Sequence, residues 1–340
     1  MTKIYLIRHA EAEGNLYRRM QGQYNSRITQ NGLAQIEALK QRFADVSIDA
    51  VYASDLYRTC KTAEAICFPK ALPLHTDLRF REVCVGAWEN QPFGWLERTD
   101  PESLAAFGQD PEHWLIPGAE PYEQYSARFL EALTELAKKH EGQSIAVFTH
   151  GCVLSGGLHR LLGLPHDASQ SDNTAVSLLR YENGSFSPVF LFDNSHLSAE
   201  ISTRARRQRA RQLLGGRLNL WFREAEASDA VLYAPELTPA PGDRVWIGML
   251  DETPVGYTAV SETGLTALWL KPEYRHRRLG DQLFGQAVAV LRADGVKAIT
   301  IPVSADNSEA TAFFLHLCGN PVQTDCRCAV FRTEIGISQT

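Results

Sequence analysis

The sequence lacks any apolar run long enough to span a bilayer, and it shows no secretory signal peptide. It also lacks an excess of positive charge, because its formal net charge of −6 argues against a general nucleic-acid-binding protein. Its seven cysteines are an odd number, scattered and without the spacing of zinc ligands, which is typical of reduced thiols. We therefore expect a cytoplasmic protein that binds neither membranes nor nucleic acids.

Length and composition favour a folded protein with two domains. A chain of 340 residues exceeds what one hydrophobic core usually covers. Its hydrophobic content of 44% and charged content of 22% are ordinary for a globular protein. After residue 198 the composition changes to a polar, arginine-rich stretch, typical of a linker or a solvated bridging helix. We predict one domain over residues 1–198, a basic linker over 199–217, and a second domain over 218–337.

Two short apolar stretches are each followed by a histidine. Residues 3–7 have the β-branched and aromatic composition of a buried strand and lead into Arg8 and His9. Residues 144–148 repeat this pattern shortly before His150. If the two strands are neighbours in one parallel sheet, both imidazoles lie at its carboxyl edge, where open α/β sheets bind ligands. The arginine adds a forked cation suited to phosphate or carboxylate.

An arginine and a glutamate elsewhere in the chain complete this candidate site. A strand predicted over residues 50–53 leads into a helix, and Arg58 lies in or near its first turn, where an anion is favoured. Glu82 lies close to Gly86 and Trp88. A lone arginine on a helix is most often solvated, and a lone histidine at a strand end is most often a surface or cap residue. Two histidines and two arginines together favour a binding site for an anion.

These stretches resemble the histidine phosphatase superfamily, whose fold is shared with cofactor-dependent phosphoglycerate mutases. The matching text is Leu6-Ile7-Arg8-His9-Ala10-Glu11, Ser54-Asp55-Leu56-Tyr57-Arg58-Thr59, Glu82 followed by Gly86-Ala87-Trp88-Glu89, and Thr149-His150-Gly151. The resemblance implies a three-layer α/β fold with a mainly parallel sheet. It implies that His9 is the nucleophile and that Glu82 is the proton donor. It implies that the phosphate ligands are Arg8, Arg58 and His150, and that the substrate-binding residues are Asn15, Gln21, Gly22 and Gly151.

The chemistry of these residue types agrees with that resemblance. A neutral imidazole suits attack on a phosphate dianion, which repels anionic nucleophiles, and the product is a phosphohistidine. Arg8, Arg58 and a protonated His150 would neutralise the phosphoryl oxygens, a task that Mg²⁺ performs in kinases. We therefore expect hydrolysis of a small-molecule phosphate ester without a metal ion. A short insertion over residues 92–125 resembles phosphatases more than the larger mutases, and mutase-like phosphotransfer is the alternative.

The pattern of the second domain predicts an α/β fold with a mixed sheet. Residues 245–250 and 254–260 form a predicted hairpin, and a strand over 265–270 leads into a basic turn that opens a helix. A strand over 298–303 and a helix over 308–317 follow. This domain resembles GNAT acyltransferases, in which the strand-to-helix turn binds the pyrophosphate of acetyl-CoA. The resemblance implies acetyl-CoA as cofactor and the following binding residues: Leu270, Arg275, His276, Arg277, Arg278, Leu279, Gly280 and Asn307.

Two positions depart from the GNAT pattern. Arg278 occupies the place of the pattern's first glycine, where a side chain obstructs close approach of the backbone. Phe314 stands where many members have a tyrosine that protonates the departing thiolate. Three interpretations stay open: acetylation of a small amine beside the phosphatase, acetylation as the principal activity with a companion phosphatase, or a degenerate domain used for binding or dimerisation. The oligomeric state is not predicted.

Overall fold

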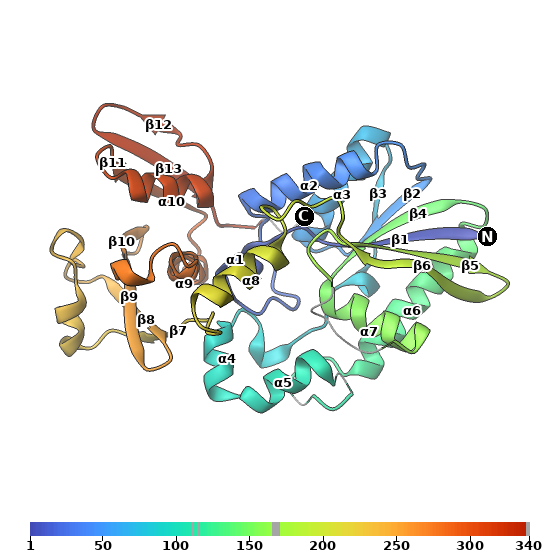
Figure 1. Ribbon diagram of the computed structural model, residues 1–340, viewed down its shortest axis with the longest axis horizontal. Helices are drawn as coiled ribbons and strands as arrows, with labels where there is room; N and C mark the ends of the chain where they lie inside the picture. The colour runs from blue at the N-terminus through green and yellow to red at the C-terminus, as the bar shows by residue number, and fades with distance from the viewer. Residues whose placement is uncertain (111, 115, 165–170, 338–340) are drawn as a thin grey trace. The chain divides into compact units, whose positions relative to one another are not determined.

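The computed structural model describes residues 1–110, 112–114, 116–164 and 171–337 (Figure 1). The chain divides into two compact units. The N-terminal unit consists of residues 1–12, 20–89 and 100–207. The C-terminal unit consists of residues 13–19, 90–99 and 208 onward. Two short segments from the first hundred residues therefore fold with the C-terminal part of the chain.

A six-stranded sheet of order β3-β2-β4-β1-β5-β6 forms the centre of the N-terminal unit. The strands are β1 (Thr2–Arg8), β2 (Ala50–Ala53), β3 (Leu74–Thr76), β4 (Ser144–Thr149), β5 (Val176–Glu182) and β6 (Ser185–Asp193). The first four strands of that order run parallel, whereas β5 and β6 pair antiparallel. Arg8 lies opposite Thr149 in the β1–β4 pair. The mainly parallel sheet and the adjacency of the two strands that precede histidines are thereby confirmed.

Helices cover both faces of this sheet (Figure 1). They include α3 (Tyr57–Lys70) with α2 (Gln30–Arg42), and α6 (Tyr122–Lys139) with α7 (Gly151–Leu162). The unit also contains α5 (Pro101–Gln109) and the short 3₁₀ helices η1 (Leu78–Phe80) and η2 (Gly86–Trp88). Leu39 of α2 and Ile66 of α3 belong to one buried cluster with Phe148 of β4. Helices α6 and α7 pack closely, since a Cβ at Gly157 would lie 2.3 Å from the Phe129 ring. The candidate site lies beyond the carboxyl ends of β1 and β4, between these helical layers.

Helix α8 (Thr203–Leu213) lies in the stretch that the composition marks as a basic linker, and it carries the chain from one unit to the other. Its first residue is buried, and the Thr203 hydroxyl donates to the Glu11 carboxylate at 2.9 Å. The linker is therefore helical, as one of the two expected forms, and its beginning is tied to the N-terminal unit. The domain boundaries themselves stay a prediction.

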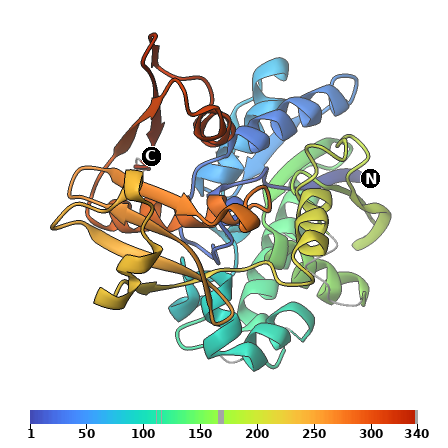
Figure 2. The same ribbon diagram turned by 60° about the vertical axis from the view of Figure 1, so that its left-hand side comes forward.

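The C-terminal unit contains two antiparallel sheets, of order β10-β9-β8-β7 and β11-β13-β12. Its strands are β7 (Trp221–Glu224), β8 (Arg244–Leu250), β9 (Thr253–Val260), β10 (Leu265–Leu270), β11 (Ala298–Ser304), β12 (Gln323–Thr324) and β13 (Cys328–Glu334). Its helices are α1 (Glu13–Tyr17), α4 (Phe93–Thr99), α9 (Leu279–Ala293) and α10 (Ser308–Cys318), with 3₁₀ helices η3 (Ala227–Leu232), η4 (Pro235–Leu237) and η5 (Pro272–Tyr274). Figure 2 shows its orange and red strands from a second direction. The α/β class is confirmed, and instead of one mixed sheet the described strands form two antiparallel ones.

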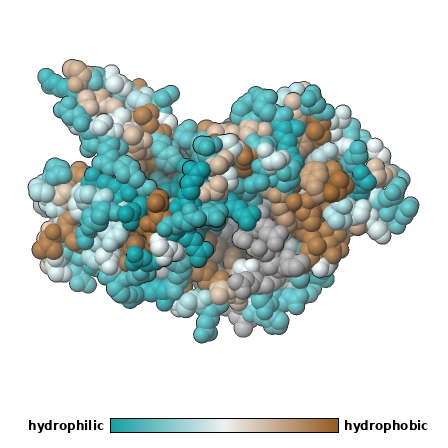
Figure 3. Space-filling view, in the orientation of Figure 1, coloured by the Kyte–Doolittle hydropathy of each residue, from teal (hydrophilic) through white to brown (hydrophobic). Residues whose placement is uncertain are grey.

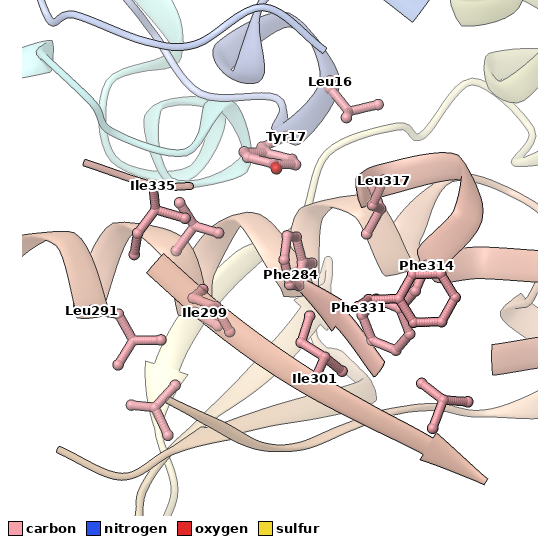
Figure 4. Close-up of a cluster of buried hydrophobic side chains, with 14 of the residues drawn as sticks. Leu16, Tyr17, Phe284, Leu291, Ile299, Ile301, Phe314, Leu317, Phe331 and Ile335 are labelled. Atoms are coloured by element: carbon pink, nitrogen blue, oxygen red, sulfur yellow. The ribbon is translucent and has the colours of Figure 1, made fainter. Parts of the chain in front are cut away.

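One apolar core of this unit gathers side chains from α9, α10, β11 and β13 (Figure 4). Phe284, Phe314 and Phe331 are buried in it. Leu16 and Tyr17 of α1 enter the same core with exposed fractions of 5% and 8%. Because burial of apolar surface is the main force that drives packing, these two side chains explain why residues 13–19 belong to the C-terminal unit.

Within the described residues no helix is both long enough and apolar enough to cross a membrane. Hydrophilic residues cover most of the face that Figure 3 shows.

Candidate active site

The two predicted histidines converge beyond the ends of neighbouring strands. His9 follows β1 and His150 follows β4, and the His9 backbone N–H donates to the Thr149 carbonyl at 3.0 Å, which continues the parallel pairing. Their ring centroids lie 5.2 Å apart. Both side chains are buried, with exposed fractions of 2% and 0%. The expectation that both imidazoles meet at one edge of the sheet is confirmed.

Hydrogen bonds fix the tautomer of His9. Its Nδ1 lies 2.7 Å from the Ala10 carbonyl, which can only accept, so Nδ1 carries the proton and Nε2 carries the lone pair. Burial lowers the pKa of His9 well below 6.5, and the charges of Arg58 and Arg8 lower it further. His9 is therefore neutral at pH 7. A neutral imidazole with a free Nε2 is the form that a nucleophile needs.

The backbone around His9 is held by two side chains. The Thr62 hydroxyl accepts from the Ala10 N–H at 2.9 Å, and the Asn173 side-chain amide donates to the His9 carbonyl at 2.9 Å. Both polar side chains are buried. Hydrogen bonds from buried groups on two sides restrict the rotation of this backbone, so the imidazole is held before any ligand binds.

Arg58 lies in the first turn of α3 and is completely buried, so it is not the solvated helix arginine that it would most often be alone. Its Nη2 donates to the Gly22 carbonyl at 2.7 Å and its Nη1 to the Tyr24 carbonyl at 3.0 Å. Its Nε donates to Nδ1 of His150 at 3.1 Å. Burial lowers the pKa of Arg58 to about 10, which keeps the guanidinium charged at neutral pH.

Hydrogen bonds and burial hold His150 in its neutral form. Its Nδ1 accepts from Arg58, so the proton is on Nε2, which faces the Ser54 hydroxyl at 3.0 Å. Burial lowers the pKa of His150 well below 6.5, and the neighbouring Arg58, His9 and Arg8 lower it further. A protonated His150 beside a bound phosphoryl group stays a prediction.

Arg8 extends from the end of β1 with part of its guanidinium unsatisfied. Its Nη1 donates to the Ser171 carbonyl, but its buried Nε has no hydrogen-bond partner among the described residues. A Cβ at Gly151 would lie 3.1 Å from the guanidinium carbon, so the glycine leaves room for this side chain. A buried donor without an acceptor is costly, and an anionic ligand would remove that cost.

Glu82 is held against the first turn of α7. Its Oε1 accepts from the backbone N–H of Val153 at 2.9 Å and from its own neighbour Val83 at 3.0 Å. Its Oε2 accepts from the N–H of Cys152 at 3.1 Å. Since His150 is the N-cap of this helix, the carboxylate and the second imidazole are positioned by the same turn.

The predicted substrate-binding residues have different surroundings. Gly22 turns its carbonyl to Arg58, and Gly151 makes room for Arg8, so both act through the arginines. The Gln21 side chain accepts from the Ser26 hydroxyl at 2.5 Å. Asn15 lies in α1, in the C-terminal unit. Direct contact of these four residues with a substrate stays a prediction.

Sequence reasoning missed two residues. Ser54 accepts from His150, and the Glu89 carboxylate accepts from the backbone N–H groups of Gln23 and Tyr24, in the loop whose carbonyls bind Arg58. Ser54 lies in the quoted Ser54–Thr59 stretch, but nothing in its neighbourhood indicated a partner distant in sequence. Glu89 was quoted only as part of the stretch after Gly86. The signal was present in that stretch, since a carboxylate beside a turn glycine is a typical acceptor for backbone N–H groups.

The second candidate site lies where β10 leads through η5 into α9. His276 and Arg278 adopt left-handed backbone conformations, with φ of +57° and +64°. Arg278 therefore has the conformation that a glycine would adopt more easily, and its guanidinium pairs with Asp281 at 3.1 Å. Gly280 lies against the Phe313 ring, 3.0 Å from a Cβ placed there. At this turn Gly280 consequently has little room for a side chain, and the backbone of Arg278 is strained.

The remaining predicted cofactor residues give a mixed result. Arg275 donates to the Leu270 carbonyl at 3.0 Å and pairs with Glu309 at 2.7 Å, so it braces the turn. Asn307 caps α10 by accepting from the Ala310 N–H at 2.9 Å. The first turn of α9 still offers backbone N–H groups and the positive end of the helix dipole, which fit a pyrophosphate. The first turn of α9 is therefore compatible with binding of a pyrophosphate.

The same test fails for the proton donor of acyl transfer. Phe314 has no hydroxyl, and its ring is buried between Phe284 and Phe331, with centroids at 6.0 and 5.9 Å. This position supplies no proton.

In the described part of the chain, no three His, Cys, Asp or Glu side chains gather as metal ligands would. Metal independence stays a prediction for experiment.

Comparison with known proteins identifies both parts of the chain. The family model for the Histidine phosphatase superfamily (branch 1) matches residues 4–194, and the model for the Acetyltransferase (GNAT) family matches residues 215–319. Probable phosphoglycerate mutase GpmB of Yersinia pestis (strain Pestoides F) is 33% identical over 189 residues, which cover 56% of this chain and 85% of that protein.

Solved structures with the same fold include Bacillus stearothermophilus YhfR, at 30% identity and a TM-score of 0.55 over 58% of this chain and 100% of that one. The alpha-ribazole phosphatase from Shigella flexneri is 26% identical with a TM-score of 0.50, over 56% of this chain and 96% of that one. The chain therefore belongs to branch 1 of the histidine phosphatase superfamily, with a GNAT-family domain after the phosphatase domain. The order of the two predicted domains is confirmed.

Proposed function

We propose that the N-terminal domain hydrolyses small-molecule phosphomonoesters through a phosphohistidine on Nε2 of His9, without a metal ion. One observation carries the proposal: His9 is neutral, its Nδ1 is tied to a carbonyl so that Nε2 holds the lone pair, and the charges of Arg58 and Arg8 act on the ring. Arg58 and Arg8 supply the positive charge that a phosphate dianion needs. The unpartnered Nε of Arg8 supports an anion as the ligand.

The reaction has two steps. In the first, Nε2 of His9 forms a bond to phosphorus while the bond to the ester oxygen breaks, and Glu82 in its acid form donates a proton to that oxygen. In the second, Glu82 as carboxylate takes a proton from water, whose oxygen bonds to phosphorus as the bond to His9 breaks. Inorganic phosphate leaves, and the enzyme regains its starting state. During both steps the arginines stabilise the charge on the phosphoryl oxygens.

Phosphate release from a panel of phosphomonoesters, measured in EDTA, tests this proposal. We expect turnover by the wild type and its loss in His9→Ala, together with acid-labile, base-stable phosphate on His9 in enzyme quenched during turnover. Turnover that survives His9→Ala would contradict the mechanism. Activity lost in EDTA and restored by Mg²⁺ would contradict metal independence.

Phosphotransfer between hydroxyls is the second candidate, because a relative covered over most of its length is named a phosphoglycerate mutase. The two activities share the phosphohistidine and differ in its acceptor, which is water or a second hydroxyl. Phosphoryl migration within a substrate, without release of phosphate, would favour the mutase. The likeness to an alpha-ribazole phosphatase supports hydrolysis.

We further propose that the GNAT-family domain binds acetyl-CoA at the first turn of α9. The helix N-terminus and the exposed His276 support this placement for the pyrophosphate. Acetyl-CoA should then raise the thermal midpoint of the full chain, whereas acetate should not. Transfer to a small amine is the finer proposal, tested by thiol release with an amine panel. A binding-only domain would show the thermal shift without thiol release.

The seven free cysteines support a reducing compartment such as the cytoplasm.

A further inference from the structure

The loop over residues 22–24 provides the carbonyl groups around Arg58. The Gly22 and Tyr24 carbonyls accept from its guanidinium, at 2.7 and 3.0 Å. Because Arg58 has no exposed surface, water does not offer it alternative acceptors. The orientation of this cation therefore depends on the position of the loop.

Glu89 holds that loop. Its Oε1 accepts from the Gln23 N–H at 2.9 Å, and its Oε2 accepts from the Tyr24 N–H at 2.6 Å. Oε1 also accepts from the Val85 N–H at 3.1 Å, which ties the carboxylate to the turn before η2. A Cβ at Gly22 would lie 2.1 Å from Oε1, and the φ of this residue is +48°, so glycine is required there.

We propose that Glu89 is the positioning residue of Arg58: it holds the 22–24 loop so that the guanidinium is oriented before the phosphate ester binds. Hydrogen bonds to a charged acceptor are stronger than neutral ones, so a carboxylate suits this task better than an amide. Glu89 acts through Arg58 and does not contact the reacting atoms. The inference rests on the proposed phosphatase activity for the identity of the ligand.

A double-mutant cycle with Arg58 tests this inference. We measure the affinity for inorganic phosphate and the kcat and KM of a phosphate ester for Glu89→Gln, Arg58→Met and the double variant. Glu89→Gln should weaken phosphate binding by roughly tenfold or more, the scale of one hydrogen bond to a charged group. In the double variant the Glu89 change should add nothing to the Arg58 loss. Asp49→Asn, which removes a carboxylate that accepts from the Ser144 N–H at 2.8 Å, is the matched control and should bind phosphate as the wild type does.

Unchanged phosphate affinity in Glu89→Gln, or losses that multiply in the double variant, would overturn the inference. If Glu89→Gln does not fold, Glu89→Asp offers the same test, because it keeps the charge but is one methylene too short to hold the N–H groups of Gln23 and Tyr24 together. Phosphate binding needs no turnover, so this test stays informative if His9→Ala remains active and the proposed hydrolysis fails. Conversely, wild-type behaviour of Glu89→Gln with an inactive His9→Ala would refute only the positioning role.

A second inference comes from the two segments that fold with the C-terminal unit. The Glu13 carboxylate accepts two hydrogen bonds from Arg292 of α9, at 2.8 and 2.9 Å. Arg19 donates to Gln286 of the same helix at 2.9 Å and to Asn90 at 2.9 Å. Helix α9 thus holds residues 13–19 at both ends, and Asn90 links them to the segment over 90–99.

Chain connectivity relates these segments to the catalytic residues. Residue 13 follows His9 by four positions, and residue 19 precedes Gly22 by three. The segment over 90–99 begins directly after Glu89. The chain passes between the units over only a few residues at each of these points. A displacement of residues 13–19 or 90–99 would therefore move the backbone next to His9 or next to the loop around Arg58.

We infer that α9 positions the phosphatase residues through residues 13–19, so that Arg292 affects phosphate-ester turnover. The inference rests on the proposed function, and a readout independent of turnover accompanies it. In the full chain, Arg292→Met should lower kcat/KM roughly tenfold, which lies within the range by which residues between two coupled positions change their coupling. Arg292→Lys should recover part of that loss. Arg244→Met, which removes an exposed pair with Asp294 beside the same helix, is the matched control and should leave turnover unchanged.

Hydrogen exchange of residues 13–19 separates the outcomes. Faster exchange together with lower kcat/KM in Arg292→Met supports the inference. Faster exchange with wild-type turnover would show that the segment moves without affecting the site, and the inference would be wrong. Unchanged exchange would equally refute it. If His9→Ala keeps its activity, the proposed hydrolysis fails, while the exchange result still reports on the hold of α9.

Discussion

Gly285 lies in the interior of α9, where alanine usually stabilises a helix relative to glycine by about 1 kcal/mol. Here we expect the opposite. A Cβ at this position would lie 2.3 Å from Cβ and 2.4 Å from Cγ of Tyr17, closer than the 3.0 Å below which real Cβ contacts essentially never occur. Because Cβ and Cγ are close to the backbone, rotation of the tyrosine does not relieve the overlap. Either α9 or the segment over residues 13–19 has to move.

The magnitude follows from what each movement costs. Overpacking a well-packed core costs about 1–3 kcal/mol. If the segment leaves the core instead, the burial of Leu16 and Tyr17 is lost, and each such side chain contributes about 1.5–3 kcal/mol. The cheaper response is a local shift. An overlap with a carbon fixed to the backbone places the cost at the upper end of that range, so after subtracting about 1 kcal/mol for helix propensity we expect Gly285→Ala to lower the free energy of unfolding by up to about 2 kcal/mol.

Urea-induced unfolding of the full chain measures this effect. Gly108→Ala in α5 is the matched control, because nothing lies within 4 Å of a Cβ placed there. The control should be stabilised by up to about 1 kcal/mol. If Gly285→Ala is as stable as the control, Tyr17 does not pack on α9 as described. The reasoning about residues 13–19 would then fail as well.

Three further predictions concern charge, backbone strain and an apolar core. Burial lowers the pKa of His9 and His150 in the folded state only, so the unfolded state binds more protons below pH 6.5. The free energy of unfolding should therefore fall as pH decreases from 6.5, and less so in His150→Gln; equal slopes by urea titration would contradict this. Arg278→Gly should relieve the left-handed φ, worth about 1 kcal/mol, but it leaves the buried Asp281 carboxylate without its arginine, which costs more, so its thermal midpoint should fall below that of Arg277→Gly; the reverse ranking would contradict this. Phe314→Tyr should cost about 1–3 kcal/mol in urea unfolding, because its hydroxyl enters an apolar core; wild-type stability would show a partner there.

The strands and the edge residues of the phosphatase site were predictable because their signals are local. An apolar stretch of strand length that leads into Arg8 and His9 determines β1, and the stretch before His150 determines β4 in the same way. Parallel pairing then brings both imidazoles to one edge without further information. The position of Arg58 in the first turn of α3 was also predictable.

Protonation and burial at the same site were not predictable, because they depend on loops distant in sequence. Arg58 is buried by the 22–24 loop, which in turn depends on Glu89. His150 is neutral because Arg58 donates to its Nδ1 and because burial disfavours charge. Sequence spacing identifies which residues meet at a sheet edge. It does not indicate which of these residues already donates a hydrogen bond to another of them.

The division of the chain shows a second limit of local patterns. Leu16 and Tyr17 lie within the part of the chain that matches the histidine phosphatase family, a few residues after His9, where the polar composition predicts only a loop. Hydrophobic burial has no direction, so an apolar pair joins whichever core leaves it the least exposed surface. In this chain that core is formed by α9, α10 and the strands around them. Residues 13–19 therefore fold with the C-terminal unit, although the chain runs into them directly from the stretch that contains His9. Neither family pattern by itself contains this arrangement.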